Sequence, residues 1–159
     1  MVFVGPLRST DVAVTVSIAG PEDAAALTQA FVRLVPQLSR SNPPPDLEAV
    51  EGMLAHAAIT QFLARDDEGE IVGASTLAVF PIPTARRAWI EDVIVESTRN
   101  GQGIGRQLID AMVAEARALG CATVDLTSRP SREAANHLYQ SAGFERRDTN
   151  VYRKTFGEG

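Results

Sequence analysis

The chain has little cysteine: only Cys121 occurs among its 159 residues. One thiol cannot form an internal disulfide, and a structural zinc site needs several cysteine or histidine ligands. Cys121 opens an apolar segment, and unpaired cysteines are commonly buried, so we expect it to be a structural thiol. The sequence predicts neither a disulfide framework nor a metal site.

Long apolar runs are also absent. No stretch approaches the ~18 apolar residues of a membrane-spanning helix. The apolar opening of the chain is interrupted by Arg8 and Asp11 before a signal-peptide core can develop. We therefore expect a cytoplasmic protein with a loose N-terminal extension over residues 1–13. Residues 14–159 are expected to form one domain, because 45% hydrophobic residues suffice for one sizeable core.

Basic residues do not dominate the composition. Fifteen Lys and Arg residues face twenty Asp and Glu residues, for a formal net charge of −5. This balance argues against a general nucleic-acid surface, although it permits a local basic site around Arg99, Arg106 and Arg129. We expect no nucleic-acid or membrane partner, and the sequence leaves a homodimer open.

The hydrophobic pattern that is present alternates between strand and helix periods. Proline and glycine clusters separate the segments, and the loop over residues 37–45 contains three consecutive prolines. We expect helices over residues 21–34, 46–56, 104–119 and 131–142. Strands are expected over residues 14–18, 59–64, 71–80, 89–95, 121–127, 144–147 and 151–156. The order predicts an α+β fold with a mixed sheet.

Three glycines at alternate positions, Gly101, Gly103 and Gly105, lie between an expected strand and an expected helix. A glycine loop can turn its backbone N–H groups toward an anion, and the helix N-terminus adds unpaired donors. A P-loop is excluded because Arg106 and Gln107 stand where it requires Lys and Ser or Thr. A dinucleotide-binding fingerprint needs a glycine in place of Arg106, although Asp125 lies at a suitable distance for one.

Two longer segments resemble one family. The stretch from Ile90 to Leu108, with Asn100-Gly101-Gln102-Gly103-Ile104-Gly105 at its centre, resembles motif A of the Gcn5-related N-acetyltransferases (GNAT). Residues 133–144 resemble motif B of the same superfamily. The family usually has Arg or Gln where Asn100 stands, and Arg99 comes one position early. The resemblance implies a mostly antiparallel sheet flanked by about four helices, with a splayed parallel strand pair that holds acetyl-CoA.

The resemblance also implies where acetyl-CoA binds. In the family, the strand equivalent to residues 89–95 has a bulge, and its freed backbone groups pair with the pantetheine arm. The pyrophosphate would bind the loop amides. On this basis the cofactor-binding residues are Val93, Ile94, Val95, Asn100, Gly101, Gln102, Gly103, Ile104, Gly105, Arg106 and Asn136.

Catalytic roles follow from the same resemblance. Tyr139 would be the general acid for the departing CoA thiolate, with a packing role as the alternative. Glu91 and Asp92 are adjacent acids in an apolar strand, where acids are depleted. We favour Glu91 as base or amine anchor, because it shares the face of Val93 if no bulge intervenes. The alternative is a structural ion pair of these acids with Arg86 or Arg87.

The acceptor is expected near Asp92 and near Arg40 of the proline-rich connection, which would form a stiff wall over the acceptor end. The sequence thus predicts an N-acetyltransferase in which an amine attacks acetyl-CoA directly, so Cys121 is not a nucleophile. The alternative is a noncatalytic acyl-CoA-binding sensor or interaction module. The acceptor itself is not identified.

Overall fold

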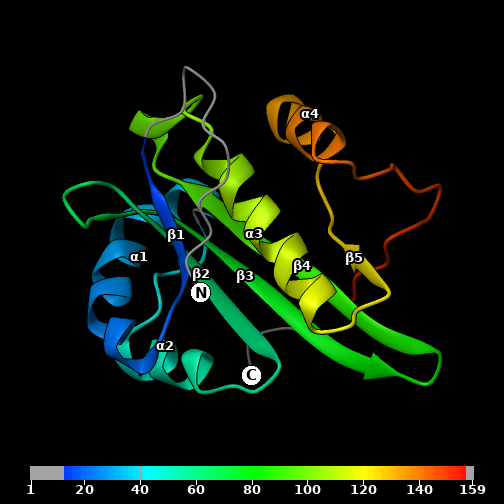
Figure 1. Cartoon of the computed structure of the whole chain (residues 1–159), viewed down its shortest axis with the longest axis horizontal. Helices are drawn as coiled ribbons and strands as arrows, with labels where there is room; N and C mark the ends of the chain where they lie inside the picture. Colours follow the sequence, from blue (N-terminus) through cyan, green and yellow to red (C-terminus); the bar gives the residue numbers. More distant parts are fainter. Residues whose placement is uncertain (1–12, 40, 157–159) are drawn as a thin grey trace. The chain divides into compact units, whose positions relative to one another are not determined.

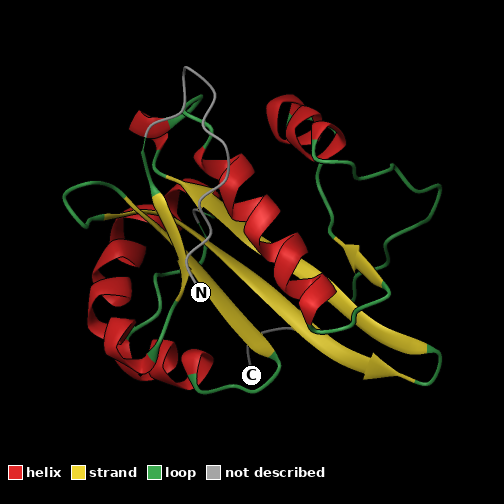
Figure 2. Ribbon diagram, viewed as in Figure 1, coloured by secondary structure: helices red, strands yellow, loops and turns green. Residues whose placement is uncertain are grey.

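A five-stranded sheet forms the centre of the larger of two compact units (Figures 1 and 2). The computed structural model describes residues 13–39 and 41–156, and the units divide after Thr127 and are described separately. Neighbouring strands pair in chain order, antiparallel except for β4 with β5. The strands are β1 (Thr15–Ile18), β2 (Ile59–Arg65), β3 (Ile71–Ile82), β4 (Ala85–Val95) and β5 (Thr123–Asp125). The predicted α+β fold with a mostly antiparallel mixed sheet is confirmed.

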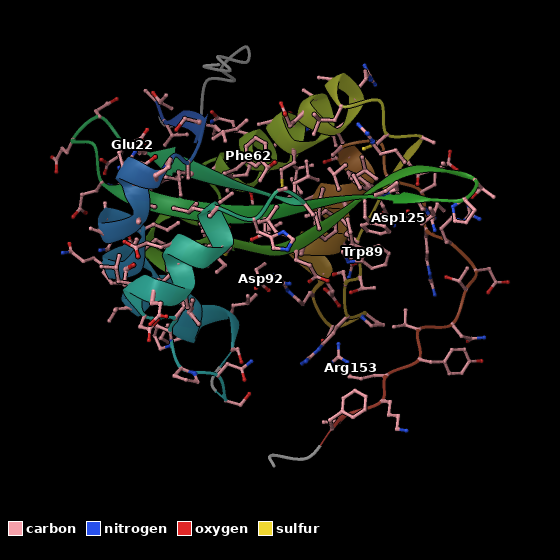
Figure 3. All side chains as sticks on the ribbon, turned by 90° about the horizontal axis from the view of Figure 1, so that it is seen from below. Glu22, Phe62, Trp89, Asp92, Asp125 and Arg153 are labelled. Carbon is pink, nitrogen blue, oxygen red and sulfur yellow. The ribbon has the colours of Figure 1, made fainter. Side chains whose placement is uncertain are left out.

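Helices cover both faces of this sheet, as the view in Figure 3 shows. On one face, α1 (Ala24–Leu38) and α2 (Leu47–Leu54) pack in a buried cluster with Ala74 of β3. The other face carries α3 (Ile104–Ala118). A Cβ atom added at Gly73 would lie 3.3 Å from side-chain atoms of Ile104 and Leu108. Glycine at this position therefore allows α3 to approach the sheet closely.

The helix ends follow local capping chemistry. The Asp46 carboxylate caps α2 by accepting a hydrogen bond from Ala49 N at 2.9 Å. The prediction that His56 ends this helix is wrong, because α2 ends at Leu54. His56 lies beyond it, where its Nδ1 accepts from Ala58 N at 3.2 Å. Helix α1 continues past Pro36 to Leu38, four positions beyond its predicted end.

The hairpin of β3 and β4 is longer than predicted. The strand predicted over residues 71–80 continues to Ile82 as β3, and Pro81 pairs with Arg86. Strand β2 pairs with β3 only as far as Ala78, so Pro81 lies where β3 has one neighbour. A missing N–H donor is tolerated at such an edge. None of the described helices is long and apolar enough to cross a membrane.

The smaller unit begins at Ser128 and contains α4 (Glu133–Ser141), which confirms the fourth predicted helix. The two strands predicted over residues 144–147 and 151–156 are wrong, because this segment is neither helix nor strand in the structure. Val151, Tyr152 and Phe156 are exposed there. Alternating apolar residues favour a strand only when a neighbouring strand supplies its hydrogen-bond partners, and no described strand pairs with this segment.

Candidate functional site

A β-bulge interrupts β4 at the two residues that follow Glu91. Glu91 pairs with Thr76 and Ile94 pairs with Ala74, so Asp92 and Val93 together oppose a single residue of β3. Asp92 has a φ of 51° and is the only non-glycine residue with a positive φ in the described part of the chain. The bulge implied by the family resemblance is therefore present, and it leaves backbone groups of β4 outside the regular ladder.

Strands β4 and β5 separate soon after they pair. Their parallel ladder joins Arg87–Trp89 to Thr123–Asp125, whereas β4 continues to Val95. Within the described residues, no strand pairs with the β5-facing edge of β4 from Ile90 onward. This free edge, which includes Val93, Ile94 and Val95, could accept an extended amide-containing ligand in the manner of an added strand.

The glycine loop follows β4 and presents unpaired amides. Gly101 and Gly103 have φ values of 79° and 78°, a conformation that side chains rarely adopt. In the described part of the chain, the N–H groups from Gly101 to Gly105 have no acceptor, and Gln107 N in the first turn of α3 donates to Gly103 O at 3.1 Å. The predicted anion cradle thus has its donors available at a helix N-terminus.

Polar side-chain atoms beside the loop also lack partners. Gln102 Oε1 and Gln107 Nε2 are buried without a hydrogen bond. Buried polar groups normally have partners, so these two atoms are exceptions beside the loop. Ile104 contributes its amide at the helix start while its side chain is buried in the core. Asn100 is exposed at the entry to the loop.

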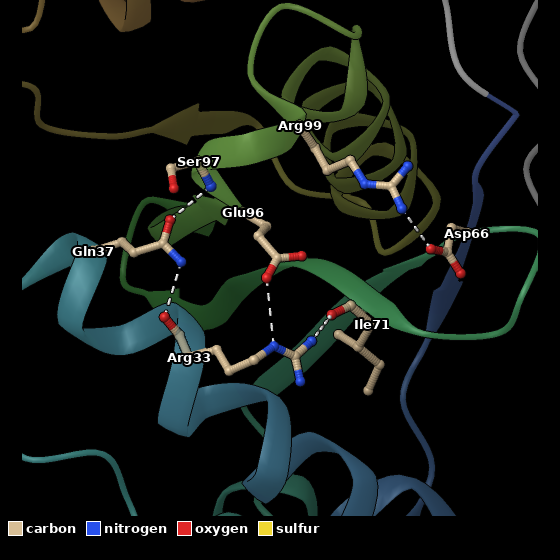
Figure 4. Close-up of polar contacts among 7 residues, drawn as sticks. All are labelled: Arg33, Gln37, Asp66, Ile71, Glu96, Ser97 and Arg99. Carbon is tan, nitrogen blue, oxygen red and sulfur yellow. Dashed lines mark hydrogen bonds and ion pairs between the residues drawn. The ribbon is translucent and has the colours of Figure 1, made fainter.

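Other elements fix the turn that leads into this loop, as Figure 4 shows. Arg99 forms an ion pair with Asp66 in the β2–β3 turn, with Nη2 and Oδ2 2.9 Å apart. Ser97 N donates to Gln37 Oε1 of α1 at 2.7 Å. Arg33 of the same helix contacts Glu96 at 3.4 Å. The loop is therefore held on both sides, by a helix and by a hairpin turn.

The candidate basic residues Arg99 and Arg106 are both engaged by carboxylates of the protein. Arg99 is engaged by an Asp66 carboxylate that is only 7% exposed, so it positions the loop rather than pointing at a ligand. Arg106 Nε donates to both carboxylate oxygens of Asp110 along α3, each at 2.9 Å. The backbone amides are thus the main anion donors that the described loop offers.

The acids of β4 are exposed, and neither is paired with the nearby arginines. Arg86 donates to Leu119 O at 2.9 Å, and Arg87 forms an ion pair with Asp125 at 3.1 Å. The alternative in which Arg86 or Arg87 neutralises these acids is wrong. Instead, Trp89 Nε1 donates to a carboxylate oxygen of Glu91 at 2.8 Å, so this side chain has a fixed position.

Glu91 lies on the face of the sheet that α1 and α2 cover. It pairs directly with Thr76, and Ile94 pairs with Ala74, whose side chain packs under these helices. Directly paired residues point to the same side, and Ala74 and Thr76 are one strand period apart. Because the bulge intervenes, Glu91 shares this face with Ile94. A face shared with Val93 was expected only for a strand without a bulge, and that condition is not met.

The smaller unit contains the remaining predicted residues, Asn136 and Tyr139. Asn136 Nδ2 donates to Arg129 O at 2.9 Å and so holds the segment before α4. Tyr139 is 8% exposed, and its ring meets that of Phe144 edge to face at 6.1 Å. Burial raises the pKa of the Tyr139 phenol above its ordinary value, and the nearby charge of Arg132 opposes this shift. The phenol is therefore protonated at neutral pH.

The predicted acceptor residue Arg40 lies outside the described residues. Sequence reasoning missed Trp89 as the partner of Glu91, although its position one strand period earlier was a usable signal. It also missed Gln61, which is 3% exposed and donates to Ser75 O at 2.9 Å. An amide in the middle of the apolar segment around it was the available sign.

Comparison with known proteins agrees with this fold and loop. Residues 28–144 match the Acetyltransferase (GNAT) family. The chain is thus an enzyme of the N-acetyltransferase class. It belongs to the GNAT family, which confirms the resemblance found in the sequence.

Individual relatives differ in how much of their length is matched. The chain is 31% identical over 143 residues to aminoglycoside N(6')-acetyltransferase type 1 of Stenotrophomonas maltophilia, covering 87% of this chain and 90% of that protein. It is 33% identical over 89 residues to mycothiol acetyltransferase of Propionibacterium freudenreichii, covering 56% of this chain but 28% of the relative. An aminoglycoside acetyltransferase from an uncultured soil metagenomic sample, solved in complex with sisomicin, has the same fold. Its TM-score is 0.78, with 21% identity and coverage of 90% of this chain and 97% of that one.

Proposed function

We propose that this enzyme transfers the acetyl group of acetyl-CoA to a primary amine of a small molecule or peptide. The observation that supports the proposal is that β4, with a free edge beyond Trp89, leads into a loop whose amides from Gly101 to Gly105 have no acceptor among the described residues. An extended amide chain suits a strand edge, and a pyrophosphate suits a helix N-terminus. Acetyl-CoA combines these two groups.

The proposed binding residues divide by chemistry. Backbone groups of Val93, Ile94 and Val95 would pair with the pantetheine arm. The loop amides would bind the pyrophosphate. Asn100, Gln102 and Arg106 border that loop, and Asn136 is proposed to contact the pantetheine through the amide oxygen that its bond to Arg129 O leaves available.

The proposed reaction is a direct attack without a covalent enzyme intermediate. The amine nitrogen bonds to the acetyl carbonyl carbon, the carbon–sulfur bond breaks, and the products are an acetamide and CoA. The nitrogen loses one proton and the sulfur gains one, so the proton count balances. Glu91 or Asp92 would take the proton from nitrogen, directly or through water, and Tyr139 would donate a hydrogen bond or a proton to the thiolate.

The acceptor is proposed to be cationic. Glu91 and Asp92 are exposed carboxylates on β4, and no ion pair with a cation of the described residues neutralises them. Such a pair attracts an ammonium group and can hold the neutral amine after it loses a proton. The aminoglycoside acetyltransferases among the similar proteins add polycationic amines to the candidates.

The test is a thiol-release screen with acetyl-CoA and a panel of amines: sisomicin, spermidine, lysine and a peptide with N-terminal alanine. We expect release of free CoA with at least one of them, together with a product heavier than the acceptor by one acetyl group. Acetyl-CoA binding without thiol release for any amine would contradict the proposal and would favour an acyl-CoA sensor.

A further inference from the structure

A row of three polar residues crosses the sheet beside the bulge. Gln61 on β2 pairs with Thr76 on β3, and Thr76 pairs with Glu91 on β4. Directly paired residues share a face, so the row lies on the face that α1 and α2 cover. Its inner end, Gln61, is 3% exposed, whereas Glu91 at its outer end is exposed. The row therefore connects the core to the proposed reaction site.

The hydrogen bonds determine which groups of this row donate and which accept. Gln61 Nε2 donates to Ser75 O at 2.9 Å, and a backbone carbonyl oxygen can only accept. The amide is therefore oriented with Oε1 toward Thr76, whose Oγ1 is 2.8 Å away. Because Oε1 also can only accept, the Thr76 hydroxyl must donate its one proton to Gln61. Its remaining lone pairs can then serve only as acceptors.

Glu91 adds a second acceptor directly across from the first. Side chains that pair directly across two strands have Cβ atoms about 5 Å apart. Trp89 Nε1 donates to Oε1 of Glu91 at 2.8 Å, which holds the carboxylate while other lone pairs stay available. One hydrogen-bonding group could thus reach both Thr76 Oγ1 and the Glu91 carboxylate.

We propose that Thr76 and Glu91 together form the amine-binding position, and that Gln61 acts as a positioning residue that keeps Thr76 an acceptor. This inference rests on the proposed acetyl transfer. A neutral primary amine has two protons to donate to two acceptors while its lone pair attacks the thioester. A hydroxyl group has one proton and leaves one acceptor unpaired. The row therefore selects amines over alcohols.

The experiment uses the full chain and the amine that the wild-type enzyme acetylates best among sisomicin, spermidine, lysine and the alanine peptide. Michaelis constants for that amine and for acetyl-CoA are measured in Thr76→Val and Thr76→Ser. We expect Thr76→Val to raise the Michaelis constant for the amine about tenfold, which corresponds to the loss of one hydrogen bond to a polar group. The Michaelis constant for acetyl-CoA should not change. Thr76→Ser keeps the hydroxyl and should stay close to wild type.

A matched control is Thr60→Val, because Thr60 pairs with Leu77 and so points to the opposite face of the sheet. Gln61→Met should also raise the Michaelis constant for the amine, but by a smaller factor than Thr76→Val. The reason is that it frees the Thr76 proton without removing the Thr76 oxygen. The ratio of kcat/KM for n-butylamine to that for n-butanol should fall in Thr76→Val.

The outcomes separate the two proposals. If the wild-type enzyme acetylates no amine in the panel, the proposed function fails. If it acetylates an amine and folded Thr76→Val keeps the wild-type amine constant and the wild-type amine-to-alcohol ratio, the acetyl transfer stands and the role of Thr76 is overturned.

Discussion

Arg99 and Asp66 form an ion pair, with Nη2 and Oδ2 2.9 Å apart, that joins the turn before the glycine loop to the turn between β2 and β3. The same carboxylate accepts from Glu68 N and Glu70 N through Oδ1, at 3.1 Å and 3.0 Å. Asp66 thus organises its own turn and restrains the loop at once. A loop whose amides are held in place binds an anion without first losing conformational freedom.

This pair gives the first prediction. Asp66→Asn keeps an oxygen acceptor for the two amides but removes the charge that holds Arg99. We expect acetyl-CoA affinity to fall roughly fivefold, in line with about 1 kcal/mol for a partly exposed ion pair. Calorimetric titration with acetyl-CoA measures the change. Asp23→Asn, which removes the part-buried Asp23–Arg65 pair, is the control and should leave the affinity unchanged. Equal losses in both variants would show that the effect is general instability.

The second prediction concerns Gly101, whose φ is 79° and whose added Cβ would meet no atom within 4 Å. Gly101→Ala introduces backbone strain of about 1–2 kcal/mol. Gly120→Ala is a matched control, since Gly120 has a φ of 73° and equally open space after α3. We expect similar losses of thermal stability in both variants and weaker acetyl-CoA binding only in Gly101→Ala. Unchanged acetyl-CoA binding in Gly101→Ala would place the pyrophosphate elsewhere.

The glycine loop and α3 could be predicted from the sequence because their signals are local. Alternate glycines followed by an amphipathic segment define the loop and helix without reference to other strands. The family resemblance supplied the bulge, which single-strand periodicity does not reveal. The expectation that Glu91 shares the face of Val93 applied only to a strand without a bulge, because one extra residue in a strand moves every later side chain to the other face.

Contacts between distant segments were beyond local reasoning. The row of Gln61, Thr76 and Glu91 exists only once the register of three strands is set. The pairing of Arg99 with Asp66 likewise joins residues far apart in sequence. The strands predicted over residues 144–147 and 151–156 show the converse, because a strand-like pattern does not by itself supply a partner strand.

The third prediction separates the backbone role of Asp92 from its charge. Asp92 has a φ of 51° at the bulge, and glycine adopts this conformation without strain. Asp92→Gly should therefore keep the bulge and at least the wild-type melting temperature, whereas Asp92→Ala should lose roughly 1 kcal/mol of stability.

If Glu91 is the group that engages the amine, Asp92→Gly retains most of kcat/KM for the acceptor and Glu91→Gln loses it. The measurement is steady-state kinetics across pH, with melting curves for each folded variant. A large loss of kcat/KM in a stable Asp92→Gly, with Glu91→Gln near wild type, would assign the role to Asp92.

The last prediction tests Tyr139 as the proton donor to the CoA thiolate. Tyr139→Phe keeps a ring that can pack against Phe144 and removes only the hydroxyl. We expect kcat to fall by about 100-fold, as for loss of a general acid, with little change in the Michaelis constant for acetyl-CoA. Tyr152→Phe is the control, because Tyr152 is 90% exposed in the same unit.

The pH dependence of Tyr139 provides a separate check. Burial raises the phenol pKa above its ordinary value near 10. The folded state therefore favours the neutral phenol. The contribution of this phenol to stability is present below pH ~10 and is lost only as pH rises through the raised pKa. The capacity of the phenol to act as an acid follows the same pH dependence. In the wild-type enzyme, kcat should not decline between pH 7 and pH 9 on account of Tyr139. A decline of kcat in that range that disappears in Tyr139→Phe would contradict the raised pKa. An unchanged kcat in Tyr139→Phe would show that Tyr139 is only a packing residue.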